Sequence, residues 1–368
     1  MPANNSTGSV TVNSVTLESQ INRNNVTLSD YDKDRLEDVG FVTAMTLVLM
    51  GNYAQTGHFG GPLAYTPYTV ASHLVGPELG GLKFDYRRPK HPYADKFMLA
   101  GGHNAPVTYA LWIIMGEALA KKHATTGDSR YSVDPNLGML SIDVLGFRRG
   151  KAALETLLDE NGLTDHPLMS QAKLRGIRAL AGHSETTDMT NDVNGGPSGI
   201  GIATAAGKAA FWDMVGAPDS LKIMAIEGEF AMTSGHSQEM KTQALAQQVG
   251  KRLRIMMSYN NAGIDDELIG GVISSEYDAY KLADQWASYG WNVLTLDNGN
   301  DYSQVVAGLK TMENWDPEDR RPMIMIGNTV KGWWPTAVDG KIPGYGDQIV
   351  SYASHPYGFA MNLSLIHI

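Results

Sequence analysis

Acidic and amide side chains follow two apolar segments that are expected to be neighbouring strands. Residues 227–230 (Glu-Gly-Glu-Phe) come directly after the apolar run 221–226, and residues 260–263 (Asn-Asn-Ala-Gly) follow the run 253–259. The carboxyl ends of adjacent parallel strands meet at one edge of a sheet, where α/β proteins bind ligands. Carboxylate, amide and carbonyl oxygens there would suit Mg²⁺ or Ca²⁺, with a phosphate completing the shell. The same residue types are also common in loops and caps, so spacing alone leaves both interpretations open.

A glycine-rich segment precedes an alanine-rich run that is expected to form a buried helix. The segment is Gly-Gly-Pro-Ser-Gly-Ile-Gly over residues 195–201, and the helix is expected over 202–215. Backbone N–H groups at the start of a helix can bind a phosphate. No Gly-Lys-Ser/Thr follows, which excludes a P-loop, and no clear strand leads into the segment as a dinucleotide-binding fingerprint requires. Phosphate binding and tight helix packing both remain open.

Three histidines, His58, His103 and His183, each follow a glycine in a segment expected to be a loop. Loops on a rigid scaffold often carry binding and catalytic groups. The histidines lie too far apart for a short metal-binding motif, and no His-x-x-x-His occurs, which disfavours a zinc hydrolase. One such histidine is usually a loop hydrogen-bond donor, but three in similar positions favour a shared site.

The elements that must position these groups alternate along the second half of the chain. Strands are predicted at 221–226, 253–259, 291–296 and 323–326, and helices at 237–249, 276–289 and 302–312. This alternation predicts an α/β fold, with a mainly parallel sheet and helices on both faces. Two earlier helices are predicted at 34–55 and 105–120, after a polar N-terminal arm over residues 1–30.

The composition excludes several classes of protein. The chain has 368 residues, a net charge of -10 and no cysteine. The negative charge argues against a general nucleic-acid or anionic-membrane surface, and the lack of cysteine excludes disulfides and thiolate chemistry. The longest nearly apolar run, residues 41–50, is too short to span a bilayer. With no secretory signal, the expected location is the cytoplasm.

Six segments, taken in order, resemble motifs of the transketolase family. Residues 56–62 resemble its Ser-Gly-His-Pro-Gly-x-Pro loop, 97–103 its Phe-Val-Leu-Ser-x-Gly-His segment, and 182–185 its Gly-His-Pro-Glu turn. Residues 196–201 resemble its Gly-Pro-Leu-Gly-Gln-Gly, 228–230 stand at its Gly-Asp-Gly signature, and 260–261 at the closing Asn. The resemblance implies that residues 31–335 form the diphosphate-binding domain of the thiamine diphosphate (ThDP)-binding fold.

The same resemblance implies roles for individual residues. Glu229, Asn261 and the carbonyl of Gly263 would hold Mg²⁺ or Ca²⁺ against the diphosphate. His58 and His183 would face the substrate and donate hydrogen bonds or move protons. The residues expected to contact the cofactor are His103, Gly196, Pro197, Gly199, Gly228, Phe230 and Asn261.

Three features depart from the family pattern. Glu229 stands where the usual metal ligand is Asp, and Phe230 where the second signature glycine belongs. The run from Glu229 to Asn261 is also two residues longer than usual, which leaves Asn260 as an alternative ligand. These departures allow either a divergent subfamily or a weakened cofactor site.

The activity implied by the resemblance is transfer of two-carbon ketol units between sugar phosphates. One alternative is a fragment of a homodimeric 2-oxo-acid (pyruvate) dehydrogenase E1 component, because residues 329–334 resemble that family equally well. Another is a non-catalytic subunit of the same fold. No segment matches the pyrimidine-binding domain that completes the active site, so residues 336–368 are expected to be a linker truncated before it. The expected partners are a pyrimidine-binding domain or subunit, in a homodimer or heterotetramer, without nucleic acid or membrane.

Overall fold

A seven-stranded sheet lies at the centre of the computed structural model, which describes residues 11–12, 15–16, 31–134, 136–148, 162, 176–260 and 282–335. The strands are β1 (Thr11–Val12), β2 (Val15–Thr16), β3 (Lys96–Leu99), β4 (Ile223–Gly228), β5 (Leu253–Tyr259), β6 (Asn292–Leu296) and β7 (Met323–Asn328). Their order is β2-β1-β6-β7-β5-β4-β3. The five strands from β6 to β3 are parallel, whereas β1 pairs antiparallel with both β6 and β2.

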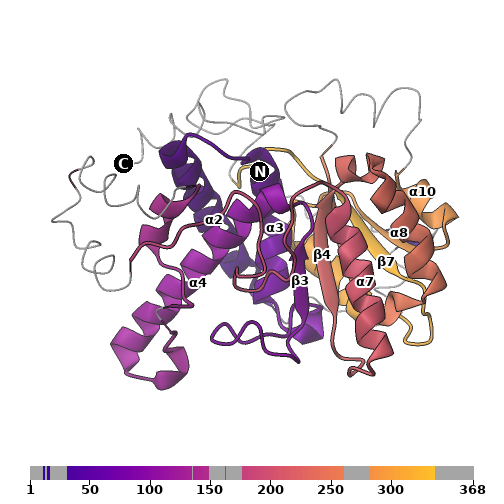
Figure 1. Ribbon diagram of the computed structural model, residues 1–368, viewed down its shortest axis with the longest axis horizontal. Coiled ribbons are helices and arrows are strands. Elements are labelled where there is room, and N and C mark those ends of the chain that lie inside the picture. Colours follow the sequence, from indigo (N-terminus) through magenta and orange to yellow (C-terminus); the bar gives the residue numbers. More distant parts are fainter. Residues whose placement is uncertain are drawn as a thin grey trace, which may run out of the picture.

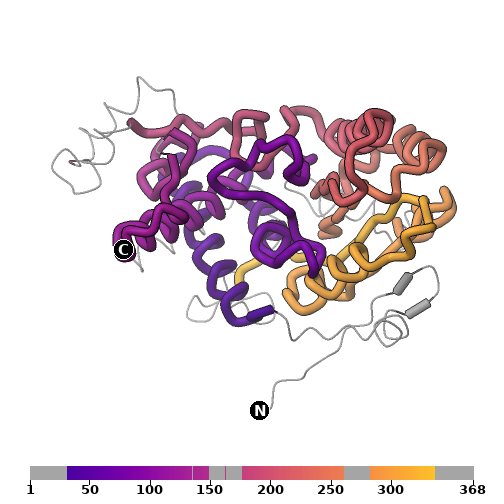
Figure 2. The backbone as a smooth tube through the Cα atoms, turned by 90° about the horizontal axis from the view of Figure 1, so that it is seen from below, coloured from indigo at the N-terminus to yellow at the C-terminus, as the bar shows by residue number. Residues whose placement is uncertain are grey.

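Helices cover both faces of this sheet, as the sequence predicts (Figure 1). One face carries α2 (Lys33–Ala54), α3 (Gly60–Leu74), α4 (Ala105–Thr126) and α11 (Tyr302–Glu313). The other carries α7 (Ile200–Met214), α8 (Gly235–Ala246) and α10 (Leu282–Ser288). Short 3₁₀ helices connect them: η1 (Pro77–Leu79), η2 (Gly102–Asn104), η3 (Ser129–Tyr131), η4 (Ser141–Gly146), η5 (Glu229–Thr233) and η6 (Val249–Lys251). Seen from below, the early helices and the α7–α8 region lie at different sides of the molecule (Figure 2).

The central strands are apolar on both faces, which explains why helices are needed on each. On β4, Met224 and Ile226 pack into the cluster under α2, α3, α4 and α11, while Ile223 and Ala225 pack into the cluster under α7 and α8. Successive side chains of a strand point to opposite faces of its sheet. A parallel strand buried on both faces therefore appears in the sequence as a continuous apolar run.

The predicted strands of the second half are confirmed. The predicted range 253–259 coincides with β5, and the ranges predicted for β4, β6 and β7 agree within two residues at each end. The helices expected near 34–55, 105–120, 202–215, 237–249 and 302–312 correspond to α2, α4, α7, α8 and α11. Of the helix expected at 276–289, residues 282–288 form α10, and residues 276–281 lie outside the described residues.

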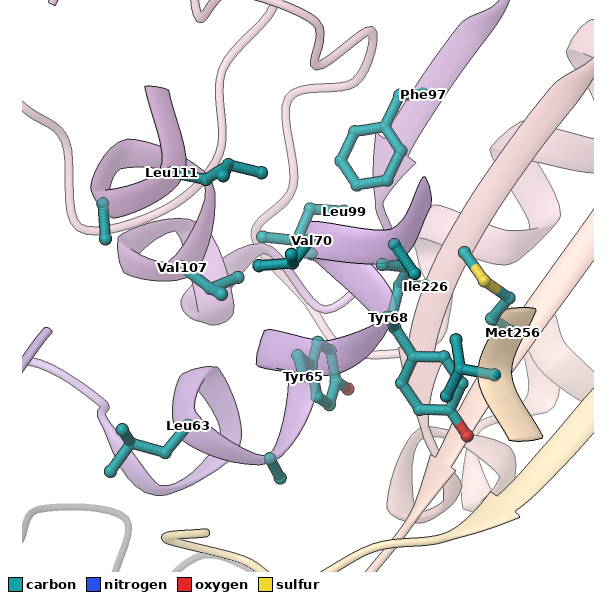
Figure 3. Close-up of a cluster of buried hydrophobic side chains, with 14 of the residues drawn as sticks. Leu63, Tyr65, Tyr68, Val70, Phe97, Leu99, Val107, Leu111, Ile226 and Met256 are labelled. Atoms are coloured by element: carbon teal, nitrogen blue, oxygen red, sulfur yellow. The ribbon is translucent and has the colours of Figure 1, made fainter. Parts of the chain in front are cut away.

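Helix α3 is missing from the sequence-based prediction, which treats residues 56–62 as a loop. Gly-Gly-Pro is ordinarily a turn signal, yet here Gly60 begins the helix. Nearly all of α3 is buried, and a helix that is buried all round shows no polar face from which to recognise it. Figure 3 shows Val70 near the strand residue Leu99 and Tyr68 near Ile226 and Met256, with Leu63 farther from the strands.

The N-terminal segment adds β1 and β2 to one edge of the described sheet. Of the predicted arm over residues 1–30, the described part is the backbone of β1 and β2, and the linker predicted at 336–368 lies outside the described residues. Among the described helices, none combines the length and the apolar character that crossing a membrane requires.

Candidate functional site at the carboxyl edge of the sheet

A pocket of about 250 Å³ opens at the carboxyl ends of β3, β4 and β5. It brings together all three glycine-linked histidines and the acidic segment after β4, which lie far apart in the sequence. The lining residues are His58, Gly61, Tyr65, His103, Asn104, His183, Gly196, Ser198, Glu227, Gly228, Glu229, Phe230, Ala231, Asn260 and Lys331. The location agrees with the rule that open α/β sheets bind ligands outside the carboxyl ends of their strands.

Backbone hydrogen bonds hold the loops of this pocket together. Ser184 N–H donates to the Gly102 carbonyl at 2.9 Å, and Gly195 N–H donates to the Ser184 carbonyl at 2.9 Å. A Cβ atom on Gly102 would lie 2.2 Å from the Gly195 carbonyl oxygen, so only glycine permits this approach. On the other side, Gly332 N–H donates to the Gly60 carbonyl at 2.8 Å and ties the segment after β7 to α3.

His58 and His103 both line the pocket, and their rings pack edge to face with centroids 5.2 Å apart. Burial, together with the charges of His58, His183 and Lys331, lowers the pKa of His103 to about 3. Nδ2 of Asn104 lies 3.2 Å from Nε2 of His103, so Nε2 accepts and the ring proton resides on Nδ1. His103 is therefore a neutral hydrogen-bonding group near pH 7.

His183 is the most accessible of the three histidines and lies at the pocket's rim. Burial lowers its pKa, and the nearby Arg148 guanidinium lowers it further. The Tyr109 hydroxyl donates to Oδ2 of Asp188 at 3.1 Å and lies 3.5 Å from the His183 carbonyl oxygen, which anchors the turn to α4. A histidine held neutral near physiological pH can accept or donate a proton to a substrate hydroxyl.

Two buried carboxylates, Glu227 and Glu229, form the acidic wall, and each side chain is 1% exposed. Glu227 Oε1 accepts from the N–H of Gly228 at 2.9 Å, while Oε2 has no hydrogen-bond partner among the described residues. Burial raises the pKa of Glu227 to about 7, and the charge of Glu229 adds to this, while the N–H groups of Gly228 and Gly199 oppose it. Tyr65 lines the same pocket, where burial and then the charges of Glu227 and Glu229 raise its pKa well above the usual value.

The side-chain oxygen atoms on this wall are of the kind that bind a hard divalent cation. A buried carboxylate oxygen without a hydrogen bond stands next to a second carboxylate, and both belong to the ligand class that Mg²⁺ and Ca²⁺ favour. Within the described ranges, no group of three or more His, Asp or Glu forms a complete metal site by itself. Further ligands would have to come from a bound anion, from amide or carbonyl oxygens, or from water. The predicted ligands Asn261 and Gly263 lie outside the described residues, and Asn260, the alternative ligand, lines the pocket.

The start of α7 supplies the expected anion-binding element. Gly199 has a positive φ of 85°, and a Cβ atom there would lie 1.9 Å from Oγ of Ser234. Gly201 lets α7 approach β3, because its Cβ would lie 2.3 Å from Cα of Ala100. The N–H groups of this helix start are suited to binding a phosphate group. Glycine is therefore required here both for the turn and for the close packing of α7.

Most of the predicted site residues meet at this pocket. His58, His103, His183, Gly196, Gly228, Glu229 and Phe230 line it, whereas Pro197 and Gly199 are not part of its lining. Pro197 is exposed, and Gly199 is buried behind the wall with its N–H near Glu227.

Four lining residues with polar side chains, Tyr65, Asn104, Glu227 and Lys331, were given no individual role from the sequence. Tyr65 was missed together with α3. Glu227 precedes the motif positions and could have been noticed, because an acid within an apolar strand is costly unless its charge is compensated. Lys331 is 5% exposed. Its position in the sequence, shortly after β7, could have indicated that it belongs to the site. Nothing in the sequence distinguishes Asn104 from an ordinary residue at a helix start.

Comparisons with known proteins agree with this geometry. Residues 151–353 match the family model described as the thiamine diphosphate binding domain of transketolase. The chain is 23% identical over 318 residues to a 6-deoxy-6-sulfo-D-fructose transketolase subunit of Clostridium sp. (strain MSTE9), covering 86% of this chain and 91% of that protein. It is 26% identical over 285 residues to a transketolase of Rhodobacter capsulatus, covering 76% of this chain but 33% of that enzyme.

Solved transketolase structures share the fold. The Leishmania mexicana enzyme superposes with a TM-score of 0.56 at 19% identity, over 80% of this chain and 36% of its own. The Campylobacter jejuni enzyme gives 0.59 at 19% identity, over 88% of this chain and 41% of its own. The chain thus spans well under half the length of these two enzymes. The solved structures show the fold, and the family match over residues 151–353, more than half of the chain, shows that the chain belongs to the transketolase family, in the part described as its thiamine diphosphate binding domain.

Proposed function

We propose that this chain binds ThDP together with a divalent cation and is the diphosphate-binding half of an enzyme that transfers two-carbon ketol units between sugar phosphates. The observation that carries the proposal is the convergence of three histidines, a carboxylate wall and the start of α7 on one pocket. The similarity to a chain described as a transketolase subunit, over 91% of that subunit's length, supports a role as one half of a two-part enzyme.

Residues on the pocket wall, together with the predicted ligands Asn261 and Gly263, would hold the cofactor. Glu229 would bind Mg²⁺ or Ca²⁺, with Asn261 or Asn260 and the carbonyl of Gly263 as further ligands. The backbone of Gly196 and neutral His103 would hydrogen-bond the diphosphate. When bound, ThDP supplies the stabilised carbanion that ketol transfer requires.

The remaining side chains would act on the substrate or shape the site. His58 and His183 would donate hydrogen bonds to the sugar hydroxyls and carbonyl, or move a proton at those oxygens. Lys331 would place a positive charge beside the bound anion. Phe230 and Tyr65 would exclude water from the cofactor's diphosphate end.

In the proposed enzyme, a further domain or subunit completes the site. We propose a pyrimidine-binding domain or subunit, supplied in a cytoplasmic homodimer or heterotetramer, because the chain corresponds to about a third of the Rhodobacter transketolase. The pyruvate dehydrogenase alternative shares this requirement and differs in its substrate.

Calorimetry of ThDP binding tests the proposal. Titrating the chain with ThDP and Mg²⁺ should give a saturable heat, with the complementary half present if one is encoded nearby. Glu229→Ala should abolish the cation-dependent part of that signal. With the complementary half, xylulose 5-phosphate rather than pyruvate should act as the donor. Absence of any heat under both conditions would leave the non-catalytic subunit as the better description.

A further inference from the structure

A second pocket, of about 280 Å³, opens at the amino ends of β4, β5 and β7. Lys222 immediately precedes β4, Arg254 is the second residue of β5, and Met323 is the first residue of β7. The site described above lies at the carboxyl ends of the sheet strands. The six residues of β4 separate the two edges by about 20 Å. This amino-edge pocket is therefore distinct from the carboxyl-edge pocket.

Arg254 places a buried charge on the wall of the amino-edge pocket. The residue is 7% exposed. Its Nη1 donates to the carbonyls of Gly250 at 2.6 Å and Leu253 at 3.0 Å. Nε is buried without a hydrogen-bond partner, and no carboxylate of the described residues forms an ion pair with this side chain. Burial lowers the pKa of the guanidinium, and the charges of Glu313 and Asp95 offset this only in part.

The unused edge of this guanidinium matches a carboxylate. Nε and Nη2 form the side edge of an arginine, where two N–H groups lie parallel in one plane. Two such groups can donate to the two oxygens of one carboxylate. A buried charge without a partner costs free energy. A bound carboxylate would supply the acceptor that the described protein does not provide to Arg254.

Lys222 adds a second positive charge to the same pocket. Burial lowers its pKa, and the charge of Arg254 is the next largest cause. The two cations therefore lie close enough to repel each other. Nζ of Lys222 donates to the Lys251 carbonyl at 3.0 Å and lies 3.9 Å from Oε1 of Glu313. An anion bound between Lys222 and Arg254 would remove this repulsion.

The remaining cations of the pocket already have acidic partners. Lys251 lies 3.1 Å from Oδ2 of Asp219, and Arg321 lies 2.7 Å from Oδ2 of Asp319. Both pairs are formed within the pocket lining itself. The charge available to a ligand is thus that of Arg254 together with Lys222.

The other lining residues limit the charge and the size of the ligand. Glu313, Asp316 and Glu318 also line the pocket, and they would repel a multiply charged anion more than a singly charged one. Trp315 and Pro317 offer apolar surface. The volume is near the lower end of small-molecule pockets, about 300 Å³. The lining therefore suits one carboxylate on a small apolar body.

We propose that the amino-edge pocket is a second binding site of this chain, in which Arg254 and Lys222 bind the carboxylate of a small monocarboxylic acid and Trp315 contacts its apolar body. The site does not depend on ThDP, on a metal ion or on the carboxyl-edge pocket.

Fluorine nuclear magnetic resonance with 4-fluorobenzoate tests the site. Titration of the full chain should show saturable binding, and Arg254→Met should weaken it at least about tenfold. Arg320→Met removes an exposed cation outside the pocket lining and should bind like the unmodified chain. The uncharged isostere 4-fluorobenzamide should bind at least about tenfold more weakly than the acid. No saturable binding, or equal affinity in Arg254→Met, would overturn the proposal.

Two further variants keep the test decisive if Arg254→Met does not fold, which circular dichroism would reveal. Lys222→Met should weaken binding of 4-fluorobenzoate and leave that of 4-fluorobenzamide unchanged. Benzoate should also change the tryptophan emission of the chain, and Trp315→Phe should remove that change. An unaltered response in Trp315→Phe would place the ligand elsewhere and reject the site.

Competition experiments identify the ligand class and the pocket. Acetate should displace 4-fluorobenzoate more effectively than inorganic phosphate does, and the opposite order would reject a monocarboxylate site. ThDP with Mg²⁺ should not displace the probe, because displacement would place it in the carboxyl-edge pocket. If 4-fluorobenzoate binds through Arg254 but ThDP with Mg²⁺ gives no heat, the amino-edge site stands and the proposed function fails. If ThDP binds while 4-fluorobenzoate ignores Arg254, the reverse holds.

Discussion

The hydrogen-bond partners of a buried polar residue decide its protonation state, as His73 on α3 illustrates. Its Nδ1 donates to the Thr69 carbonyl at 2.8 Å, and its Nε2 accepts from the Thr190 hydroxyl at 2.9 Å. The contact at Nε2 requires the neutral ring, because a protonated Nε2 cannot accept a hydrogen bond. The imidazole also packs edge-on against Phe84 and Phe97, and among the described residues no carboxylate contributes to its pKa shift.

The stability of the chain should therefore fall when His73 becomes protonated. Burial lowers the pKa of His73 from 6.5 to about 4. Because the unfolded chain takes up the proton first, this contribution to stability is fully present above pH 6.5 and is lost as the pH falls to 4. The loss amounts to about 3 kcal/mol at most.

Urea unfolding at pH 7 and pH 4 measures this effect. His73→Asn should be less stable than the unmodified chain at pH 7, but should lose less on acidification. His91→Asn, a change at an exposed histidine, is the control and should keep the original pH profile. An identical loss in His73→Asn would contradict the assignment.

Lys331 should contribute to anion binding through its charge. It is 5% exposed, lines the pocket and lowers the pKa of His103. Lys331→Met should weaken pyrophosphate binding in the presence of Mg²⁺ by about tenfold, which corresponds to roughly 1.4 kcal/mol. It should also raise the His103 pKa in a nuclear magnetic resonance titration. Lys121→Met, an exposed position on α4, should change neither quantity.

At the scale of elements, the docking of α7 on the sheet depends on one glycine. A Cβ on Gly201 would lie 2.3 Å from Cα of Ala100, a backbone atom that cannot move aside cheaply. Gly207, on the same helix, has nothing within 4 Å of an added Cβ. The two positions form a matched pair. Helix propensity favours alanine over glycine at both, but only position 207 has space for a Cβ atom.

Gly201→Ala should destabilise the chain by about 1–3 kcal/mol, the usual cost of overpacking. Gly207→Ala should instead stabilise it by up to about 1 kcal/mol, since alanine loses less backbone entropy in a helix. Thermal unfolding of both variants measures the difference. If both substitutions shifted stability in the same direction, α7 would not be held as closely as the geometry indicates.

The elements differ in how far the sequence alone could predict them. Strands β4, β5 and β7 were predictable because burial on both faces requires a continuous apolar run. Helix α3 was not, since its Gly-Gly-Pro start resembles a turn and complete burial removes the polar face. The four-residue strand β3 was missed as well, because Lys96 and the following glycines interrupt the apolar pattern around it.

The site was predictable as a set of motifs but not as a geometry. The resemblance to known motifs predicts that His58, His103 and His183 share one site. Their spacing in the sequence gives no such indication. The unsatisfied oxygen of Glu227 depends on the approach of the α7 start, and the neutral state of His103 depends on burial and on Lys331. These are tertiary properties, which a single sequence does not encode in any local pattern.

At the scale of the whole molecule, the pocket joins segments from both ends of the described chain. His58 comes from the turn before α3, Glu229 follows β4, and Lys331 follows β7. The helices that carry these segments belong to two hydrophobic clusters on opposite faces of one sheet. A ligand that contacts all three segments therefore stabilises the folded sheet as a unit.

ThDP with Mg²⁺ should consequently raise the melting temperature of the entire chain. At about 100 times its dissociation constant, a ligand that binds only the folded state adds about 2.7 kcal/mol to the unfolding free energy. Thiamine without the diphosphate should produce little shift, because the residues on the pocket wall favour an anion bound with its cation. Glu229→Ala should abolish the ThDP shift and leave the melting curve without ligand cooperative. A ThDP shift that survives in Glu229→Ala, or that thiamine alone reproduces, would mean that binding does not depend on the carboxyl-edge pocket.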